Sequence, residues 1–440
     1  MKKNSLKKVV SLGVLAGCAA LILGACGGKS GSSEASGGKE EIRISWWGGD
    51  TRNKAIQEAI KKFEEKNPDI KVKAEFGGYA GYQQKLTTQL SGGTAPDVVR
   101  VDSMWLDQYQ NQLLDLNEVK DEIGMSNFKQ EDLESTIFNS KVLGMPLSMN
   151  YRPIYANQTL LDKYGIEKPT SWDDIIAMRD KLPDDVYPYW FAGVGPKGVS
   201  MVFLNTILSQ QTGKSIGDAD NNLLYTEKDF KNALEFYNDL VEKKITPSKE
   251  VVDNGGIVDG APNPFVVDGK VLLMDEFTAN TSTLESQLKE KDYELSLVGF
   301  PTMENQKSNG VWTKPSMLYS IPATSKHQKA AAKLINYLMN DPEANQIQKI
   351  ENGVPVSEVG RETLENEKLI PALTVDATEL GDKEVDNNLA YSYRWDRARI
   401  DDTLLDVVNG LGYKDMTVDE AAKKLYKAFK EEEATFEEAK

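Results

Sequence analysis

The sequence predicts a mixed α/β fold built around mostly parallel sheets, and three observations lead to this prediction. Short segments of alternating or continuous apolar residues are followed by segments with apolar residues at helical spacing, which is typical of β-α-β units. The chain has 440 residues, of which 40% are hydrophobic and 27% charged. Long low-complexity tracts and internal repeats do not occur in it. A chain of this kind can bury sizeable cores, and we expect a globular body of two domains.

The first β-α-β unit is the clearest. Residues 41–47 alternate enough to predict a strand, and residues 54–66 carry apolar side chains at helical spacing. Asp50 or Thr51 is expected to cap this helix. Residues 70–74 form the next predicted strand, and the three segments together predict the beginning of a mostly parallel sheet.

The same rhythm continues along the chain. Residues 82–91 predict a helix and residues 97–101 a buried strand. Each later helix is preceded by a capping residue or a proline. The later predicted helices cover residues 172–181, 229–243, 328–339 and 418–432, and short strands cover residues 271–274 and 295–298.

The N-terminus has the composition of an export signal. Four lysines within the first eight residues precede an apolar run over residues 9–23, and small residues then lead to Cys26. The run is shorter than the roughly 20 residues of a membrane-spanning helix. Leu23-Gly24-Ala25-Cys26 resembles the lipobox of bacterial lipoproteins. This resemblance implies that residues 1–25 are removed, that Cys26 is lipidated, and that residues 26–40 are a flexible linker.

A second possible lipobox ends at Cys18. Leu15-Ala16-Gly17-Cys18 is closer to the common pattern in its letters, but more apolar sequence follows it. Cys26 is followed by a Gly/Ser spacer, which suits a tether, and we therefore expect the lipid on Cys26.

The charge balance excludes some partners. The formal net charge of −16 becomes −20 when residues 1–25 and their four lysines are removed, and Cys26 is then the only thiol. No internal disulfide can form, which fits an extracytoplasmic protein of a Gram-positive-type cell. An acidic chain without a basic stripe does not suit nucleic acid. We expect a monomer that holds its fold by its core.

Seven segments, in order, resemble the oligosaccharide-binding solute receptors of ABC importers. The resemblance spans nearly the whole mature chain, and no single segment decides it. The segments are Ile44-Ser45-Trp46-Trp47-Gly48, residues 63–72, residues 82–86 with 92–98, Asp268-Gly269-Lys270-Val271-Leu272-Leu273-Met274, residues 321–326, Gly353-Val354-Pro355-Val356, and Thr417-Val418-Asp419-Glu420-Ala421.

The resemblance implies the two-lobed periplasmic-binding-protein-like fold of type II, with sugar held between two discontinuous lobes. It also implies delivery of the loaded sugar to the permease subunits of the importer, with the protein anchored on the extracytoplasmic face of the membrane. By analogy, lobe 1 covers residues 41–148 and 318–375, and lobe 2 covers residues 149–317 and 376–440. The hinge crossings are expected near residues 146–153, 312–319 and 374–388.

Sugar binding requires aromatic rings and planar polar groups. The apolar C–H faces of a pyranose stack on Trp or Tyr, while carboxylates, amides and guanidinium groups bind its hydroxyls. Trp46 and Trp47 end the first strand, at the edge where open α/β sheets bind ligands. Alternation predicts one of these rings in the cleft and one in the lobe, and it does not decide which.

Further candidates follow later strands and loops. Asp102 follows a predicted strand, where the family's acidic hydroxyl acceptor commonly lies; the alternative is a helix cap. Trp105 could bind ligand or be buried by its spacing to Tyr109. Tyr79 and Tyr82 lie on a glycine-rich turn without packing periodicity, which favours binding.

The remaining candidates depend more on the resemblance. Asn150 and Tyr151 lie at the expected hinge and could line the cleft or pack the hinge. Glu276 and Phe277 depart from the usual run of the family. Trp395 is the favoured stacking aromatic of the last segment, with Tyr393 in reserve. The ligand-binding prediction also includes Asp50, Arg52 and Trp312.

The class of sugar stays open. The opening Trp46-Trp47-Gly48-Gly49, together with Arg52, looks like receptors for pectin-derived acidic oligosaccharides, in which Arg or Lys pairs with uronate carboxylates. Neutral and N-acetylated oligosaccharides fit the aromatic content equally well.

The alternative function is an exported glycosidase or polysaccharide lyase. Among 68 acidic residues a catalytic carboxylate pair could exist, but no pattern marks one. The single histidine, His327, excludes a histidine-based triad or metal site. Residues 218–222 begin like a calcium loop but lack its turning glycine and its final glutamate. We expect no cofactor and no enzymatic activity. An adhesin or sensor with the same cleft shares all these features.

Overall fold

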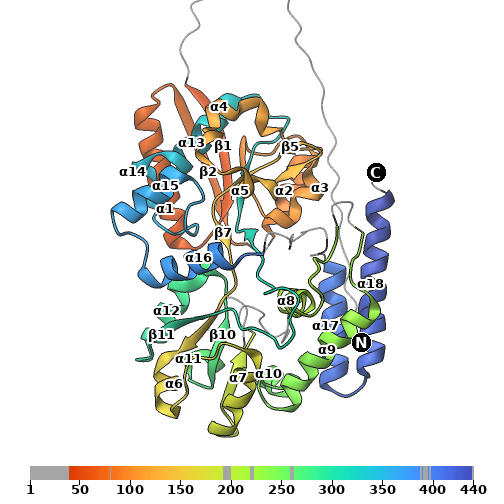
Figure 1. Ribbon diagram of the computed structural model, residues 1–440. Coiled ribbons are helices and arrows are strands. Elements are labelled where there is room, and N and C mark those ends of the chain that lie inside the picture. Colours follow the sequence, from red (N-terminus) through yellow and green to blue (C-terminus); the bar gives the residue numbers. More distant parts are fainter. Residues whose placement is uncertain are drawn as a thin grey trace, which may run out of the picture. The chain divides into compact units, whose positions relative to one another are not determined.

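The structure, a computed structural model, describes residues 39–79, 81–191, 200–218, 222–257, 262–386, 389, 395 and 398–438. Within these ranges, two larger sheets with their own helices form two lobes (Figure 1). The predicted two-lobed α/β fold is therefore confirmed. The predicted signal peptide, Cys26 and the linker as far as residue 38 lie outside the described residues.

Lobe 1 contains a five-stranded sheet in the order β2-β1-β3-β13-β6. β1 pairs in parallel with β2 and β3, as the first β-α-β unit predicts. β13 comes from much later in the chain and pairs antiparallel with β3 and β6, so the lobe is discontinuous in sequence. The strands are β1 Glu40–Trp47, β2 Ile70–Gly77, β3 Val98–Val101, β6 Met145–Pro146 and β13 Leu318–Ser320, with a small hairpin of β4 Ile137–Phe138 and β5 Lys141–Val142.

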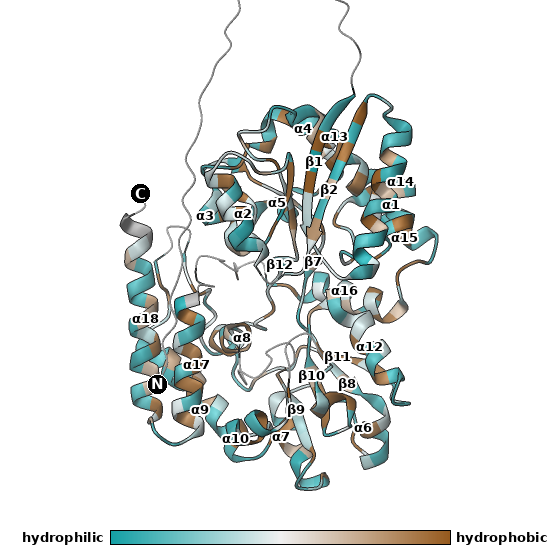
Figure 2. Cartoon of the chain, turned by 180° about the vertical axis from the view of Figure 1, so that it is seen from behind, coloured by the Kyte–Doolittle hydropathy of each residue, from teal (hydrophilic) through white to brown (hydrophobic). Residues whose placement is uncertain are grey.

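Helices cover both faces of this sheet. Alternate residues of β1 point to opposite faces, so that Trp46 faces α1 while Trp47 faces α2. Hydrophobic bands interrupt the hydrophilic surface of α1 and α13, as expected for amphipathic helices (Figure 2). The helices are α1 Asp50–Lys66, α2 Tyr82–Ser91, η1 Ser103–Trp105, α3 Leu106–Tyr109, η2 Leu116–Val119, α4 Lys120–Ile123, η3 Met125–Asn127, α5 Gln130–Glu134, α13 Gln328–Asn340, α14 Pro342–Gln348 and α15 Glu358–Asn366.

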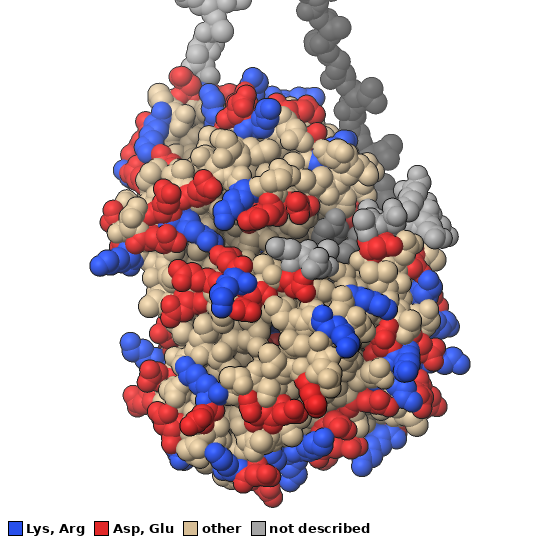
Figure 3. Space-filling model, in the orientation of Figure 1, with Lys and Arg blue, Asp and Glu red and all other residues tan. Residues whose placement is uncertain are grey.

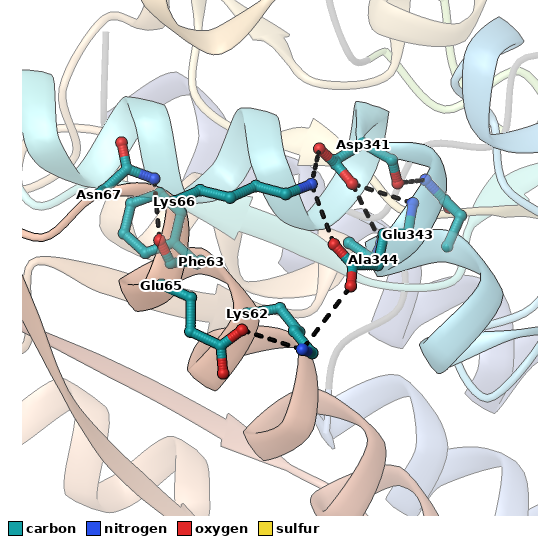
Figure 4. A network of polar contacts seen from close by, with 9 residues as sticks. Lys62, Phe63, Glu65, Lys66, Asn67, Asp341, Glu343 and Ala344 are labelled. Atoms are coloured by element: carbon teal, nitrogen blue, oxygen red, sulfur yellow. Dashed lines mark hydrogen bonds and ion pairs between the residues drawn. The ribbon is translucent and has the colours of Figure 1, made fainter.

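Ion pairs join the end of α1 to the start of α14 (Figure 4). Lys66 lies 2.9 Å from an Asp341 oxygen and 3.1 Å from a Glu343 oxygen. Asp341 also accepts a hydrogen bond of 2.9 Å from the Glu343 amide and so caps α14. The hydrogen bond with Asp341 is the main cause that raises the pKa of Lys66. These contacts fix where the late helix α14 docks on the first helix of the chain.

Within the described part of the chain, three segments cross between the lobes. The chain leaves the lobe 1 sheet after Pro146, and β7, Met149–Asn150, precedes the first lobe 2 strand. β12, Lys314–Pro315, returns antiparallel to β7, with Lys314 opposite Asn150. Helix α16, Ala372–Glu384, forms the third connection. The exact lobe limits given above stay a prediction.

Lobe 2 contains a four-stranded sheet in the order β11-β8-β10-β9. β8 is antiparallel to both neighbours, and β9 is parallel to β10. The expectation of mostly parallel pairing therefore holds for β1, β2 and β3 of lobe 1 but is wrong for lobe 2. The late helices α17 and α18 pack with α9 on this lobe. The elements are β8 Ile154–Asn157, α6 Gln158–Tyr164, α7 Trp172–Ala177, η4 Met178–Lys181, β9 Tyr187–Trp190, α8 Met201–Thr212, α9 Glu227–Glu242, α10 Lys249–Asn254, α11 Pro264–Val267, β10 Val271–Asp275, η6 Thr278–Asn280, α12 Thr281–Lys289, β11 Leu295–Gly299, α17 Ala398–Gly412 and α18 Val418–Glu438.

Helix caps agree with the sequence in lobe 2 but not at α1. Ser171 and Thr226 begin α7 and α9 with complete capping boxes. The prediction that Asp50 or Thr51 caps the first helix is wrong, because the helix already begins at Asp50 and Gly49 is its N-cap. Asp50 instead places its negative charge in the first turn, where it favours the helix dipole.

Acidic and basic side chains are interspersed over both lobes on the face that Figure 3 shows. This distribution suits a solvated surface. A search of the described residues finds no helix with the length and apolar character that a membrane crossing requires.

Candidate functional site

Four rings form an aromatic cluster at the carboxyl ends of the lobe 1 strands. Trp47 ends β1, and its ring centre lies 5.1 Å from that of Tyr82, 5.3 Å from that of Trp105 and 5.6 Å from that of Tyr79. Tyr79 and Trp105 stack with their planes 27° apart. The structure therefore brings together four of the rings that the sequence singles out, from β1, the loop after β2, α2 and η1.

The rings of this cluster differ in exposure. Trp47, Tyr82 and Trp105 are buried, whereas Tyr79 is 52% exposed. The Tyr82 hydroxyl lies 2.9 Å from the Ser45 hydroxyl, and burial raises the pKa of Tyr82 to about 12. Tyr82 therefore stays a neutral hydrogen-bonding group at any physiological pH. Tyr79 is the ring of the cluster with the most accessible surface.

Asp102 positions Trp105. One Asp102 oxygen accepts a hydrogen bond of 3.1 Å from the Met104 amide and so caps the short helix η1. The helix-cap alternative to hydroxyl binding is thus observed. The side chain is half-buried, and the cap uses one of its two oxygens.

Arg100 lies beneath the aromatic cluster and is fully buried. Its guanidinium donates to the Trp47 carbonyl at 3.2 Å, to the Tyr319 hydroxyl at 3.1 Å and to the Asn352 side chain at 3.0 Å. It also lies 5.8 Å from the ring centre of Trp47 and 5.2 Å from that of Tyr319. Cation–π attraction and hydrogen bonds together hold the end of β1 in place.

Arg52 lies in the first turn of α1, near Arg100. Its Nε donates to the Glu351 carbonyl at 2.6 Å, and Thr51 beside it donates to the Glu351 carboxylate at 2.9 Å. Burial, followed by the charge of Arg100, lowers the pKa of Arg52 to about 10. Arg52 therefore ties α1 to the segment after α14. Asp50, two residues before Arg52, is exposed.

A buried ion pair marks lobe 2 at the end of β10. Arg152 Nε lies 2.5 Å from Asp275 Oδ2, and both side chains are less than a tenth exposed. Burial raises the pKa of Asp275, although the charge of Arg152 opposes this shift. Burial acts to lower the pKa of Arg152, but the carboxylates of Asp275 and Glu276 outweigh it and raise that pKa. Arg152 consequently stays positively charged.

The ion pair lines an open pocket in lobe 2. Trp312 lies in its wall and is buried. We call this site the lobe 2 pocket. It is lined by Arg152, Ile154, Trp172, Tyr189, Val202, Phe203, Thr206, Gln210, Asp275, Phe300, Pro301, Asn309, Gly310, Val311 and Trp312.

Lys314 connects the two lobes beside Phe277. Its Nζ lies 3.9 Å from the sulfur of Met104, in the helix that carries Trp105, and 5.4 Å from the Phe277 ring centre. Arg152 lies 5.1 Å from the same ring, so Phe277 contacts two cations. Glu276, next to Phe277, accepts from the Phe277 amide and from Asn280, and burial raises its pKa.

The two hinge candidates make structural contacts. Asn150 Oδ1 accepts from the Ala279 amide at 3.2 Å. The Tyr151 hydroxyl donates to Asp382 of α16 at 2.5 Å, and Asp382 pairs with Arg361 of α15 at 3.2 Å. Both candidates therefore hold the crossing segments, which is the alternative that the sequence left open.

Two tryptophans lie away from the cluster. Trp46 is fully buried and donates to Asn53 at 2.8 Å. Trp395 is 2% exposed in the core of lobe 2, with its ring centre 5.6 Å from that of Phe429. A buried ring has no free face for a sugar, so this placement argues against stacking by Trp395. Tyr393 lies outside the described residues.

Sequence reasoning missed Arg152, Asp275, Lys314 and Arg100. Arg152 follows the crossing candidates directly, and Lys314 follows Trp312 within the second predicted crossing, so position alone could have marked both. A search of the described residues for three or more His, Cys, Asp or Glu side chains able to hold a metal ion finds no such group. Residues 219–221 of the calcium-like segment lie outside them.

Comparison with known proteins agrees with this architecture. A solved periplasmic solute-binding protein from Pectobacterium atrosepticum is 28% identical, with a TM-score of 0.84 over 91% of this chain and 99% of that one. A periplasmic oligogalacturonide-binding protein from Yersinia enterocolitica, solved with saturated digalacturonic acid, is 26% identical, with a TM-score of 0.80 over 91% of this chain and 100% of that one.

A curated relative and a family model extend the comparison. The multiple sugar-binding protein of Streptococcus mutans is 24% identical over 372 residues, which are 83% of this chain and 86% of the relative. The family model of the bacterial extracellular solute-binding proteins matches residues 48–345. The chain belongs to the family of bacterial extracellular solute-binding proteins.

Proposed function

We propose that the protein is the lipid-anchored substrate-binding component of an ABC importer and that it captures an oligosaccharide. The aromatic cluster at the strand ends of lobe 1 is the observation that carries this proposal. Rings in this position suit the apolar faces of a pyranose, and the two-lobed family fold supplies a second wall. The names of the Streptococcus and Yersinia relatives support a sugar as the ligand.

In this proposal each lobe has its own part. Tyr79 stacks on the sugar, with Trp47, Tyr82 and Trp105 supporting it, and Asp102 is the candidate acceptor of a sugar hydroxyl. Phe277 contributes apolar surface from the other side, while the buried Trp312 lies in the wall of the lobe 2 pocket. Ligand contacts from both lobes favour the closed state, so differential affinity sets the population shift.

The cations near Phe277 bear on the class of sugar. Lys314 and Arg152 lie within 5.4 Å of the Phe277 ring centre, and such groups can bind uronate carboxylates. Together with the digalacturonate bound by the Yersinia relative, this favours acidic oligosaccharides as the first ligands to test.

Calorimetric titration of residues 27–440 tests the proposal. The panel contains linear oligogalacturonides together with neutral and N-acetylated oligosaccharides of two to six units. We expect at least one class to bind and to be recovered unchanged by chromatography. Cleaved products would favour the glycosidase or lyase alternative, and a panel without any binding would contradict the proposal.

The anchor has a separate test. Cys26→Ala in the full chain is expected to prevent palmitate labelling and to release the protein from the membrane fraction, whereas Cys18→Ala is expected to change neither. The reverse pattern would place the lipid on Cys18. Loss of labelled-sugar uptake in cells lacking the protein would support delivery to a permease.

A further inference from the structure

A second exposed ring lies beside the aromatic cluster. Phe76, near the end of the edge strand β2, is 47% exposed. One face of its ring stacks on Trp46, with ring centres 5.1 Å apart and planes 23° apart. Trp46 is itself fully buried and held by its hydrogen bond to Asn53. The phenyl ring is therefore fixed from below while much of its surface remains in solvent.

Two glycines, which carry no side chain, lie between Phe76 and Tyr79 in the sequence. Gly77 and Gly78 follow it, and a Cβ added at either glycine meets no atom within 4 Å. The Gly48 amide donates to the Gly77 carbonyl at 3.0 Å, which fixes this backbone to the end of β1. Gly77 and Gly78, which we call the glycine saddle, thus present unobstructed backbone in the segment that links two exposed rings, Phe76 and Tyr79.

The two rings belong to opposite faces of the sheet. Phe76 pairs with Trp46 in the β1–β2 ladder and shares its face, whereas Tyr79 contacts Trp47 on the other face. A ligand that crosses the strand ends from the aromatic cluster therefore passes over the glycine saddle before it meets Phe76. Glycine permits close approach to backbone, because it has no side chain that obstructs a ligand.

We propose that Phe76 and the glycine saddle form a rim subsite for one further pyranose unit of the ligand. This inference rests on the proposed function and deepens it, since it assigns a chain-length preference to the same site. The ring of Phe76 stacks on the C–H face of the additional sugar, and hydroxyls of that sugar approach the backbone of the saddle. A single exposed apolar residue is common on proteins, but this ring is held against the buried Trp46 and lies three residues before Tyr79 of the aromatic cluster.

Titration with an oligosaccharide series tests the rim subsite. The probes are linear oligogalacturonides of two to six units, or the same lengths of whichever panel class binds. Phe76→Ala is expected to leave the affinity of the shortest bound ligand unchanged and to weaken longer ligands about 3- to 10-fold. Phe76→Tyr keeps the ring and is expected to retain the length preference.

Two further variants keep the test sharp. Gly77→Val places a side chain on the glycine saddle, and its Cβ meets no neighbouring atom within 4 Å. We expect it to weaken the binding of longer ligands selectively, as Phe76→Ala does. Because this variant keeps Phe76, it tests the subsite even if Phe76→Ala disturbs Trp46. Tyr413→Ala is the matched control, because Tyr413 is 51% exposed and follows α17 in lobe 2. It should leave binding at every length unchanged.

The outcomes separate the two proposals. Binding by the natural chain with equal affinity at all lengths, or an equal loss at all lengths in Phe76→Ala, would overturn the rim subsite and leave the proposed function standing. Failure of the natural chain to bind any member of the panel would overturn both.

Discussion

The two lobes hold their candidate binding groups by different physical means. The aromatic cluster of lobe 1 consists of neutral rings that support one another. The ring centre of Trp47 lies 5.1 to 5.6 Å from those of its three neighbours, and the centres of Tyr79 and Trp105 lie 5.9 Å apart. The lobe 2 pocket depends on a buried ion pair between Arg152 and Asp275. Ring contacts contribute many small attractions, whereas a buried charge is costly once its partner is gone. Lobe 1 should therefore tolerate substitutions at its exposed ring better than lobe 2 tolerates changes in its pair.

The largest expected effect breaks the pair in lobe 2. Arg152→Met leaves Asp275 buried without its main counter-charge and should lower the free energy of unfolding by about 3–5 kcal/mol. Urea denaturation followed by circular dichroism measures the change. Lys270→Met is the control, because its pair with Asp185 is exposed and screened by solvent. Equal losses in both variants would show that burial does not set the difference.

The next effect concerns helix α16, the third connection between the lobes. A Cβ at Gly381 of α16 would lie 2.1 Å from Cγ of Tyr151, so the ring must move in Gly381→Ala. We expect a loss of about 1–3 kcal/mol in the free energy of unfolding. Gly78→Ala should be neutral in the same measurement, because its Cβ meets no atom within 4 Å. Tolerance of Gly381→Ala would mean that this connection is loosely packed.

The next effect is a pH dependence of stability that arises from one acidic residue, Asp132. Burial raises the pKa of Asp132 to about 6. The positive charges of Lys129 and Arg361 oppose this shift, and the negative charges of Glu131 and Asp382 add to it. An unfolded Asp has a pKa of about 3.9, so the folded protein binds more protons between these values and loses stability as the pH rises through them.

Asp132→Asn removes this titration. The variant should be more stable than the natural chain by about 1–2 kcal/mol at pH 8, and the difference should vanish near pH 4. Thermal denaturation across this range measures it. A variant that is equally stable at pH 8 would contradict the raised pKa.

The smallest effect sharpens the lobe 1 side of the comparison. Tyr79→Ala removes an exposed ring and should weaken sugar binding by about 0.5–1.5 kcal/mol with only a small fall in the melting temperature. Tyr413→Ala removes an equally exposed ring elsewhere, and calorimetry should show unchanged affinity. If both variants bind equally well, Tyr79 does not contact the ligand.

Local patterns predict the β-α-β beginning of lobe 1 and most of the aromatic cluster. Helical spacing and strand alternation are encoded within about ten residues, and rings at strand ends and on a glycine turn lie near one another whenever the sheet forms. Tyr79 and Tyr82 could therefore be singled out, whereas alternation did not separate Trp47 from Trp46 and spacing left Trp105 open to burial.

Long-range contacts could not be predicted in the same way. The partner of Arg152 is Asp275, on another strand, and nothing near Arg152 in the sequence shows that its charge is buried. Trp395 has the composition of a binding loop around it, but Phe429 of α18 covers its ring. Pairings of this kind depend on how distant elements dock. Because its ring is buried, we expect Trp395→Ala to lower stability rather than sugar affinity.

Arg100 holds the aromatic cluster in place from inside lobe 1, and a designer of sugar sensors could use this arrangement. Its guanidinium contacts the carbonyl and ring of Trp47 from the interior, where a ligand cannot displace it. The buried contacts of Arg100 that hold Trp47 are thus separate from the two exposed rings that could be substituted, Phe76 and Tyr79. Libraries that vary only these two residues could retune the sugar preference while the scaffold keeps its rigidity, and a fluorophore placed beside them would report on each new ligand.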